Sequence, residues 1–323
     1  MGAVTLDRYL EQSADPVGHA SRLGVDAIVA SIAAVCIAIA DVLSLGALAA
    51  LPDEGDASVL MAHRMIVEAL RGRRVREFFS AANGKSTILD EAGEFALAVS
   101  PLAGAGDIAW NLPAGTIFAV ADASDAKRKI LAAGFVVYGA HTAFVLTRGA
   151  GVDIFTLDPR DRAWRLTSVE ARLPDGAQDH ENPGERRQAP AARTSMDERL
   201  VDAGEAQGVG ARWGGSLAAQ AFRILLRGGV LLDPPEGPLA HDRGLARFLC
   251  EARPIAFVIE QAGGRASNGL GRILDQTPGA LGPGAPFIIG SRRAVERIER
   301  LYVRPDGAAD VSPLFGKRGL FRA

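Results

Sequence analysis

The segment from Ala27 to Leu51 restricts the fold of this chain more than any other feature. It reads AIVASIAAVCIAIADVLSLGALAAL, and Asp26 and Asp41 bracket an uncharged run of 14 residues, 27–40. A membrane-spanning helix needs about 20 consecutive apolar residues, so this run is too short to cross a bilayer. It shows little of the alternation typical of a strand. We therefore predict a helix buried in the core of a protein that does not contact a membrane.

The composition is that of an ordinary globular protein. The chain is 48% hydrophobic and 23% charged. Its length of 323 residues fits about two domains. With a net charge of −2, the chain has no overall positive charge of the kind that attracts nucleic acid. Cys36 and Cys250 lie in apolar segments without metal or redox spacing, which indicates reduced thiols. The first residues do not read as a signal peptide, so we predict a cytoplasmic location.

The hydrophobic pattern predicts helices first and strands afterwards. Helices are expected from about Pro16 to Ala50 and from about Ser58 to Arg73. Short β-branched and aromatic runs then predict strands in EFALAV, GTIFAVA, FVVYGA, HTAFVLTRG and GVDIFTLDP.

A stretch without apolar periodicity divides the chain. Residues 173–195 are rich in proline, glycine and charge, and are interpreted as a linker or loop between an N-terminal domain (1–172) and a C-terminal domain (196–323). In the second domain we predict a helix from Ser216, as N-cap, to Arg227. Strands are expected in GGVLLDPP, PIAFVIEQAGG and APFIIG, followed by a terminal helix in SRRAVERIERLYV.

Local motifs alone identify no functional site. The five histidines have no zinc-ligand spacing, and the chain contains no nucleophile elbow and no P-loop. VSPLAGAG, residues 99–106, reads as a strand that opens into a turn of small residues, the geometry of a phosphate or metal site. This turn has no carboxylate before Asp107, which we interpret as a cap or turn residue.

Five blocks in sequence order resemble class 1 fructose-1,6-bisphosphatases, particularly the proteobacterial type. They are GTIFAV, YGAHTAFVLTRGAGVDIFTLDP, RWGGSLAAQAFRILLRGGVLLDP, RFLCEARPIAFVIEQAGGRASNGLGRILD and PFIIGSRRAVERIE. The resemblance implies an α/β fold of stacked α-β-α-β-α layers in two domains, usually assembled as a tetramer. It also implies a family reaction, the magnesium-dependent hydrolysis of fructose 1,6-bisphosphate to fructose 6-phosphate.

The sequence departs from this family at the metal site. The family motif Asp-Pro-Leu-Asp-Gly-Ser-Ser-Asn stands here as SPLAGAGD, residues 100–107, without both metal-binding aspartates and both phosphate-binding serines. The family Ser-Glu-Glu is Ser80-Ala81-Ala82. Of a further pair of aspartates, Asp56 is kept and Ala62 replaces the second. Magnesium requires several oxygen ligands, so these changes remove most of the site.

The resemblance assigns roles to four remaining groups. Glu251 and the carbonyl of Leu102 match metal ligands, and Arg212 and Arg247 match residues that bind the sugar phosphate. A structural salt bridge explains either arginine equally well, and Glu251 without the other ligands would be solvated or paired with Arg247 or Arg253. One carboxylate and one carbonyl cannot hold two magnesium ions, so we expect magnesium binding to be lost or weak.

Two functions follow from this pattern. The chain is a fructose-bisphosphatase with weak or no activity, or a non-catalytic paralogue that binds a sugar phosphate or assembles with an intact family member. In the first case we expect a homo-oligomer. In the second case we expect either a homo-oligomer or a hetero-oligomer with an intact family member. A product with no remaining role is a third alternative.

Overall fold

An eight-stranded sheet forms the centre of the structure, a computed structural model that describes residues 4–12, 19–49, 55–174, 216–233, 244–276 and 286–303. The strand order is β2-β1-β3-β4-β5-β6-β7-β8. β1 and β3 are parallel and every other neighbouring pair is antiparallel, so β1 and β3 end at the same edge. The strands are β1 (Val75–Ser80), β2 (Lys85–Ile88), β3 (Phe95–Ala103), β4 (Ala114–Asp122), β5 (Ile130–Tyr138), β6 (Thr142–Thr147), β7 (Asp153–Asp158) and β8 (Ala163–Ser168).

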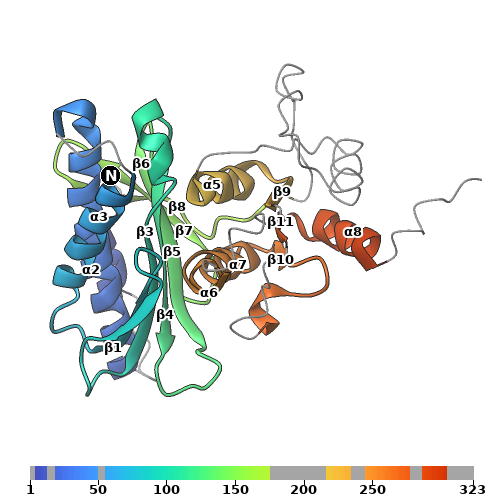
Figure 1. Ribbon diagram of the computed structural model, residues 1–323, viewed down its shortest axis with the longest axis horizontal. Coiled ribbons are helices and arrows are strands. Elements are labelled where there is room, and N and C mark those ends of the chain that lie inside the picture. Colours follow the sequence, from blue (N-terminus) through green and yellow to red (C-terminus); the bar gives the residue numbers. More distant parts are fainter. Residues whose placement is uncertain are drawn as a thin grey trace, which may run out of the picture.

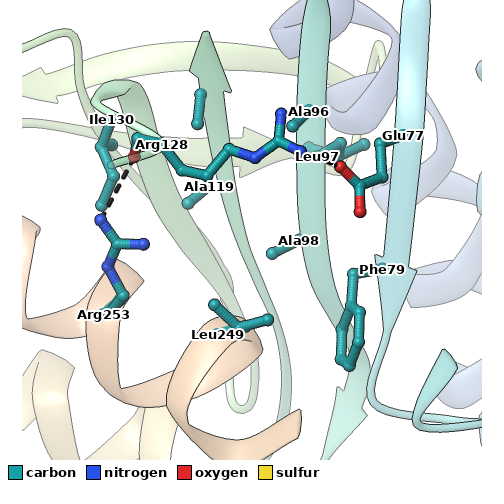
Figure 2. Close-up of a pocket in the computed structure, with 11 residues that line it drawn as sticks. Glu77, Phe79, Ala96, Leu97, Ala98, Ala119, Arg128, Ile130, Leu249 and Arg253 are labelled. Carbon is teal, nitrogen blue, oxygen red and sulfur yellow. Dashed lines mark hydrogen bonds and ion pairs between the residues drawn. The ribbon is translucent and has the colours of Figure 1, made fainter. Parts of the chain in front are cut away.

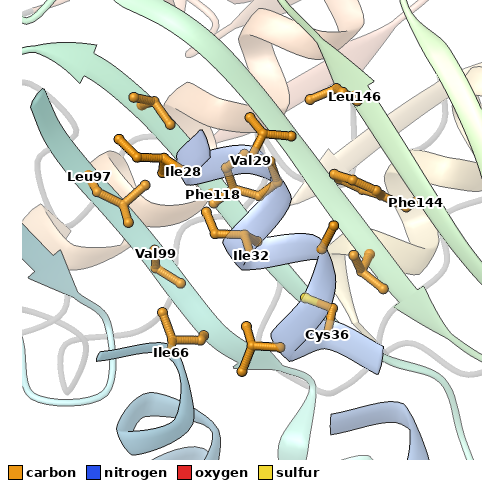
Figure 3. Close-up of a cluster of buried hydrophobic side chains, with 14 of the residues drawn as sticks. Ile28, Val29, Ile32, Cys36, Ile66, Leu97, Val99, Phe118, Phe144 and Leu146 are labelled. Atoms are coloured by element: carbon orange, nitrogen blue, oxygen red, sulfur yellow. The ribbon is translucent and has the colours of Figure 1, made fainter. Parts of the chain in front are cut away.

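Helices α1 (Leu6–Gln12), α2 (His19–Ser44) and α3 (Gly55–Ala69) come from the N-terminal part of the chain, and η1 (Gly46–Ala49) follows α2. Figure 1 shows α2 and α3 on one face of the large sheet. Ile28, Val29, Ile32 and Cys36 of α2 are fully buried against the strands, as Figure 3 shows.

The stretch Arg22–Ser44 of α2 is long and apolar enough to cross a membrane by length and composition. In this structure 56% of its most apolar window is buried inside the protein. The prediction of a buried core helix is confirmed, because the apolar side chains of this helix have the sheet as their partner.

The opposite face of the large sheet carries a second helical layer. It contains α5 (Leu217–Arg227), α6 (Gly244–Arg247), the π-helical turn η5 (Phe248–Ala252) and α7 (Arg253–Gln261). Behind these helices lies a three-stranded sheet in the order β10-β11-β9, covered on its far side by α8 (Arg292–Val303) (Figure 1). The small strands are β9 (Val230–Asp233), β10 (Arg265–Ser267) and β11 (Phe287–Gly290). Like η1, the short elements η2 (Ala105–Trp110) and η6 (Ile273–Asp275) are 3-10 helices. The layers therefore follow the predicted order α-β-α-β-α.

One predicted strand is wrong. The run PIAFVIEQAGG is not a strand, because Arg253–Gln261 forms helix α7. Ile255, Ala256, Val258 and Ile259 are all buried, at spacings of three and four residues that bring them to one helix face. β-branched residues favour strands, but burial against the large sheet outweighs that local preference.

The predicted division into two domains stays a prediction. Of the predicted linker 173–195, only Leu173 and Pro174 belong to the described residues. Leu173 is buried, and its amide donates to the carbonyl of Ala262 at 2.9 Å. The chain therefore reaches the second helical layer at this point.

Candidate functional site

The two motifs that depart from the family pattern meet at the shared edge where β1 and β3 end. The amide of Ala81 donates to the carbonyl of Val99 at 2.9 Å, which continues the parallel pairing past Ser80. Helix α3 packs against β3 and against η2, and its Ala62 is fully buried. The parallel pairing and the packing of α3 therefore bring together the positions at which the resemblance expects carboxylates. Five of these positions carry a methyl group or a hydroxyl instead: Ala62, Ala81, Ala82, Ser100 and Ala103.

Glu251, a family ligand that this chain keeps as a carboxylate, lies against the end of β3. It lies in the π-helical turn η5, which packs against β3 and β4. The hydroxyl of Ser100 donates to Glu251 Oε1 at 2.9 Å. π-helical turns are uncommon and are found frequently at functional sites. The turn thus presents Glu251 to β3 as the resemblance predicts, but a serine hydroxyl occupies the place opposite it.

Ser80 has a partner that the sequence analysis did not single out. Its fully buried hydroxyl lies 2.9 Å from Nδ1 of His63, and the amide of Ala82 donates to the same oxygen at 3.3 Å. Burial, with a smaller contribution from the neighbouring Arg64, lowers the pKa of His63, so the ring is neutral at pH 7. The contacts with His63 and with the amide of Ala82 thus hold the Ser80 hydroxyl in place.

Cys250 lies beside the same corner and is inert. Its buried thiol is 3.7 Å from the carbonyl of Phe79. Burial raises the pKa of the Cys250 thiol, and the charge of Glu251 adds to that effect. A thiol that remains protonated is a poor nucleophile and a poor metal ligand, as expected of a structural cysteine.

The turn after β3 is closely packed. The pairing of β3 with β4 shifts register between Ser100 and Ala103, and the hydroxyl of Thr116 donates to the carbonyl of Pro101 at 2.7 Å. The Leu102 side chain is part of the core. Gly104 has φ of 78° and precedes η2, a conformation that glycine adopts without strain.

Asp107 belongs to η2, where its amide donates to the carbonyl of Gly104 at 3.0 Å. This placement confirms it as a turn residue.

The start of helix α5 lies directly on this turn. A Cβ atom built on Gly104 would stand 2.8 Å from the Cβ of Ser216, so glycine is required for the close approach. Ser216 is the predicted N-cap, but its hydroxyl makes no capping bond and has no partner within the described ranges. The first turn of α5 therefore brings amide donors and a buried hydroxyl next to the Gly104 turn.

The two predicted substrate arginines have different outcomes. Arg247 ends α6, is partly buried and lies four residues before Glu251, which places both side chains on neighbouring positions of one helix. Arg212 lies outside the described residues. Arg253 forms no ion pair with Glu251, because its guanidinium donates to the backbone carbonyls of Lys127 and Arg128.

The residues of this corner do not fit a magnesium centre. Within the described ranges, no group of three or more histidine, cysteine, aspartate or glutamate side chains is close enough to hold a metal ion. Magnesium binds oxygen ligands in near-octahedral geometry, and a lone carboxylate already bonded to a serine supplies too few.

Comparisons with known proteins agree with the fold. The family model of the fructose-1-6-bisphosphatase N-terminal domain matches residues 22–169, and that of the C-terminal domain matches residues 183–303. A fructose-1,6-bisphosphatase class 1 of Nitrobacter hamburgensis is 39% identical over 99% of both chains. One of Nitrobacter vulgaris is 38% identical over 97% of this chain and 96% of that protein.

Solved structures share the architecture. The holo form of Leishmania major fructose-1,6-bisphosphatase superimposes with a TM-score of 0.78 at 23% identity, over 93% of this chain and 99% of that one. Its T-state gives a TM-score of 0.78 at 24% identity, over 95% and 100%. This likeness concerns the fold.

Proposed function

Because the chain belongs to the class 1 fructose-1,6-bisphosphatase family, we propose that it is a non-catalytic member that keeps the fold and binds a sugar phosphate. The observation that supports this best is the hydrogen bond from Ser100 to Glu251. In the family pattern an aspartate stands at position 100, and cations would separate it from the glutamate. Here a serine hydroxyl donates directly to the carboxylate, and a neutral hydroxyl cannot replace the aspartate as a charged ligand of a divalent cation.

The chemistry explains why these substitutions should weaken or abolish the family reaction. Divalent cations activate the attacking water and neutralise the charge that develops on the transferred phosphoryl group. Such electrostatic stabilisation is usually the largest single contribution to catalysis. Glu251 without its partner carboxylates cannot hold the cations, so any remaining hydrolysis is weak.

Sugar-phosphate binding does not depend on the lost carboxylates. Arg247 supplies a cation on α6, and the first turn of α5 supplies backbone donors beside the Gly104 turn. Arginine and a helix N-terminus are both suited to a phosphate group. We further propose that the protein is cytoplasmic and oligomeric, either with itself or with an intact family member.

Activity is tested by phosphate release from fructose 1,6-bisphosphate with purified protein. We expect no magnesium- or manganese-dependent turnover above the rate without protein, because the cations have no site. Glu251→Gln should leave this result unchanged. Robust magnesium-dependent turnover that Glu251→Gln abolishes would show that the chain is an active phosphatase.

Binding is tested separately, by titration calorimetry with fructose 6-phosphate. We expect saturable binding that Arg247→Gln weakens about tenfold, the loss typical of one charge-assisted contact. Arg227→Gln, which removes an exposed arginine at the end of α5, is the matched control and should bind as the wild type does. Unchanged heat and melting temperature at saturating ligand would contradict sugar-phosphate binding and leave assembly with a relative as the function.

A further inference from the structure

A pocket to which the family reaction assigns no role lies on the face of the large sheet that η5 and α7 cover. Its floor consists of four alanines on neighbouring strands, Ala96 and Ala98 of β3 and Ala119 and Ala121 of β4. Its cavity volume is about 80 Å³. Elsewhere on this face, larger side chains such as Phe135 fill the space against the helices. The run of methyl groups therefore leaves a hollow with an apolar floor.

The walls of the pocket are apolar below and charged above. Phe79 of β1 and Leu249 of η5 close its lower part, as Figure 2 shows. The side chain of Arg128 extends along the upper part and forms an ion pair with Glu77 of β1. These two opposite charges neutralise each other.

Arg253 supplies a third charge, and this charge has no counter-ion among the residues that the structure describes. Arg253 as a residue is only 8% exposed, and its guanidinium donates to the carbonyls of Lys127 and Arg128 at 3.3 and 3.2 Å. Within the same described ranges, no acceptor faces its Nε and no carboxylate pairs with it. Figure 2 shows the guanidinium reaching into the pocket between Leu249 and Arg128.

The energetic consequence is that this pocket favours an anion. Burial lowers the pKa of Arg253, the sign of a charge removed from water without compensation. A buried, unpaired charge is destabilising, and a carboxylate that reaches it recovers much of that cost. Arginine binds carboxylates through parallel hydrogen bonds.

We propose that this pocket binds a small aliphatic monocarboxylate, with the carboxylate on the guanidinium of Arg253 and the carbon chain over the four alanines. With Arg128 and Glu77 neutralising each other, the pocket carries one net positive charge, which a monoanion balances. A phosphate dianion would place an excess negative charge near Glu77. The small volume and the apolar floor limit the ligand to a chain of about three to six carbons.

This pocket is separate from the corner at Glu251. Leu249 and Arg253 are four residues apart on the same helical stretch and both line the pocket, whereas Glu251 bonds to Ser100 and does not line it. The proposal is therefore independent of the loss of the metal site.

The test is titration calorimetry of the full chain with sodium butyrate, with 1-butanol and inorganic phosphate as comparison ligands. We expect saturable binding of butyrate and a higher melting temperature in its presence. Butanol lacks the carboxylate and phosphate lacks the carbon chain, so both should bind at least about tenfold more weakly.

Two variants address the two halves of the proposed site. Arg253→Gln keeps donors for the backbone carbonyls but removes the charge, and should weaken butyrate binding at least about tenfold. Ala98→Leu fills the floor and should abolish binding without lowering the melting temperature, because the added side chain occupies the hollow. Arg293→Gln, on the exposed side of α8, is the control and should bind normally. The proposal is overturned by a folded wild type that does not bind butyrate, or by pocket variants that both bind butyrate as tightly as the wild type.

Discussion

Restoring five carboxylates should convert this chain into a magnesium-dependent phosphatase. The variant combines Ala62→Asp, Ala81→Glu, Ala82→Glu, Ser100→Asp and Ala103→Asp. We expect phosphate release from fructose 1,6-bisphosphate to rise at least about 1000-fold over the wild type, since metal-centred charge stabilisation supplies several kcal/mol to such a reaction. The fold already brings these positions together through the parallel pairing of β1 with β3 and the packing of α3.

The melting temperature gives an independent reading of the restored site. The Ser100→Asp substitution replaces a hydroxyl that lies 2.9 Å from Glu251, so two carboxylates would repel each other unless a cation separates them. The variant should therefore be less stable than the wild type without magnesium and should gain stability as magnesium is added. The wild type should show no such gain.

A matched control separates ligand chemistry from side-chain volume. Substituting the same five positions with asparagine at 62, 100 and 103 and glutamine at 81 and 82 gives nearly the same shapes without charge. This amide variant should show neither magnesium stabilisation nor turnover. A carboxylate variant that is folded and stabilised by magnesium but remains inactive would mean that other differences, such as those at Ala105 and Gly106, also prevent catalysis.

The sequence predicted the helices and strands that have a strong apolar pattern. It did not predict the strands in which polar residues interrupt that pattern. Helix α2 and strands β3 to β7 were predicted because their apolar runs are long. β1 reads VREFFS and β8 reads AWRLTS, and neither was predicted, since charged residues interrupt their alternation. β2 has four exposed residues and lies at the edge of the sheet, so burial leaves no pattern in it. At α7 the β-branched composition favoured a strand, although the spacing of the buried residues is that of a helix.

The chemistry of the site was predicted by resemblance, whereas its present contacts were not. Ser100 and Glu251 are 151 residues apart in the chain, and their hydrogen bond depends on the π-helical turn that presents Glu251 to β3. The contact between His63 and Ser80 depends on how α3 packs at the end of β1. The alanine-floored pocket is lined by residues of β1, β3, β4, β5, η5 and α7, and these residues share no motif. Such features arise from tertiary packing, which one sequence does not reveal.

Replacing Phe144 with alanine should destabilise the protein severely. Phe144 is fully buried beneath α2, with its ring centroid 6.0 Å from that of Phe118, 6.1 Å from that of Phe155 and 5.5 Å from that of Trp164. The substitution should lower the free energy of unfolding by about 3–5 kcal/mol, because it removes buried apolar surface and leaves a cavity. Chemical denaturation followed by circular dichroism measures this change.

Trp110→Ala is the control for this experiment, since it removes a larger ring that is 78% exposed and should alter stability by less than about 0.5 kcal/mol. The indole of Trp164 donates to the carbonyl of Ala33, so the aromatic cluster also holds α2 on the sheet. A loss below about 1 kcal/mol for Phe144→Ala would mean that the core tolerates cavities. The proposed binding function requires the opposite result, because packing of this core holds the binding surfaces in place.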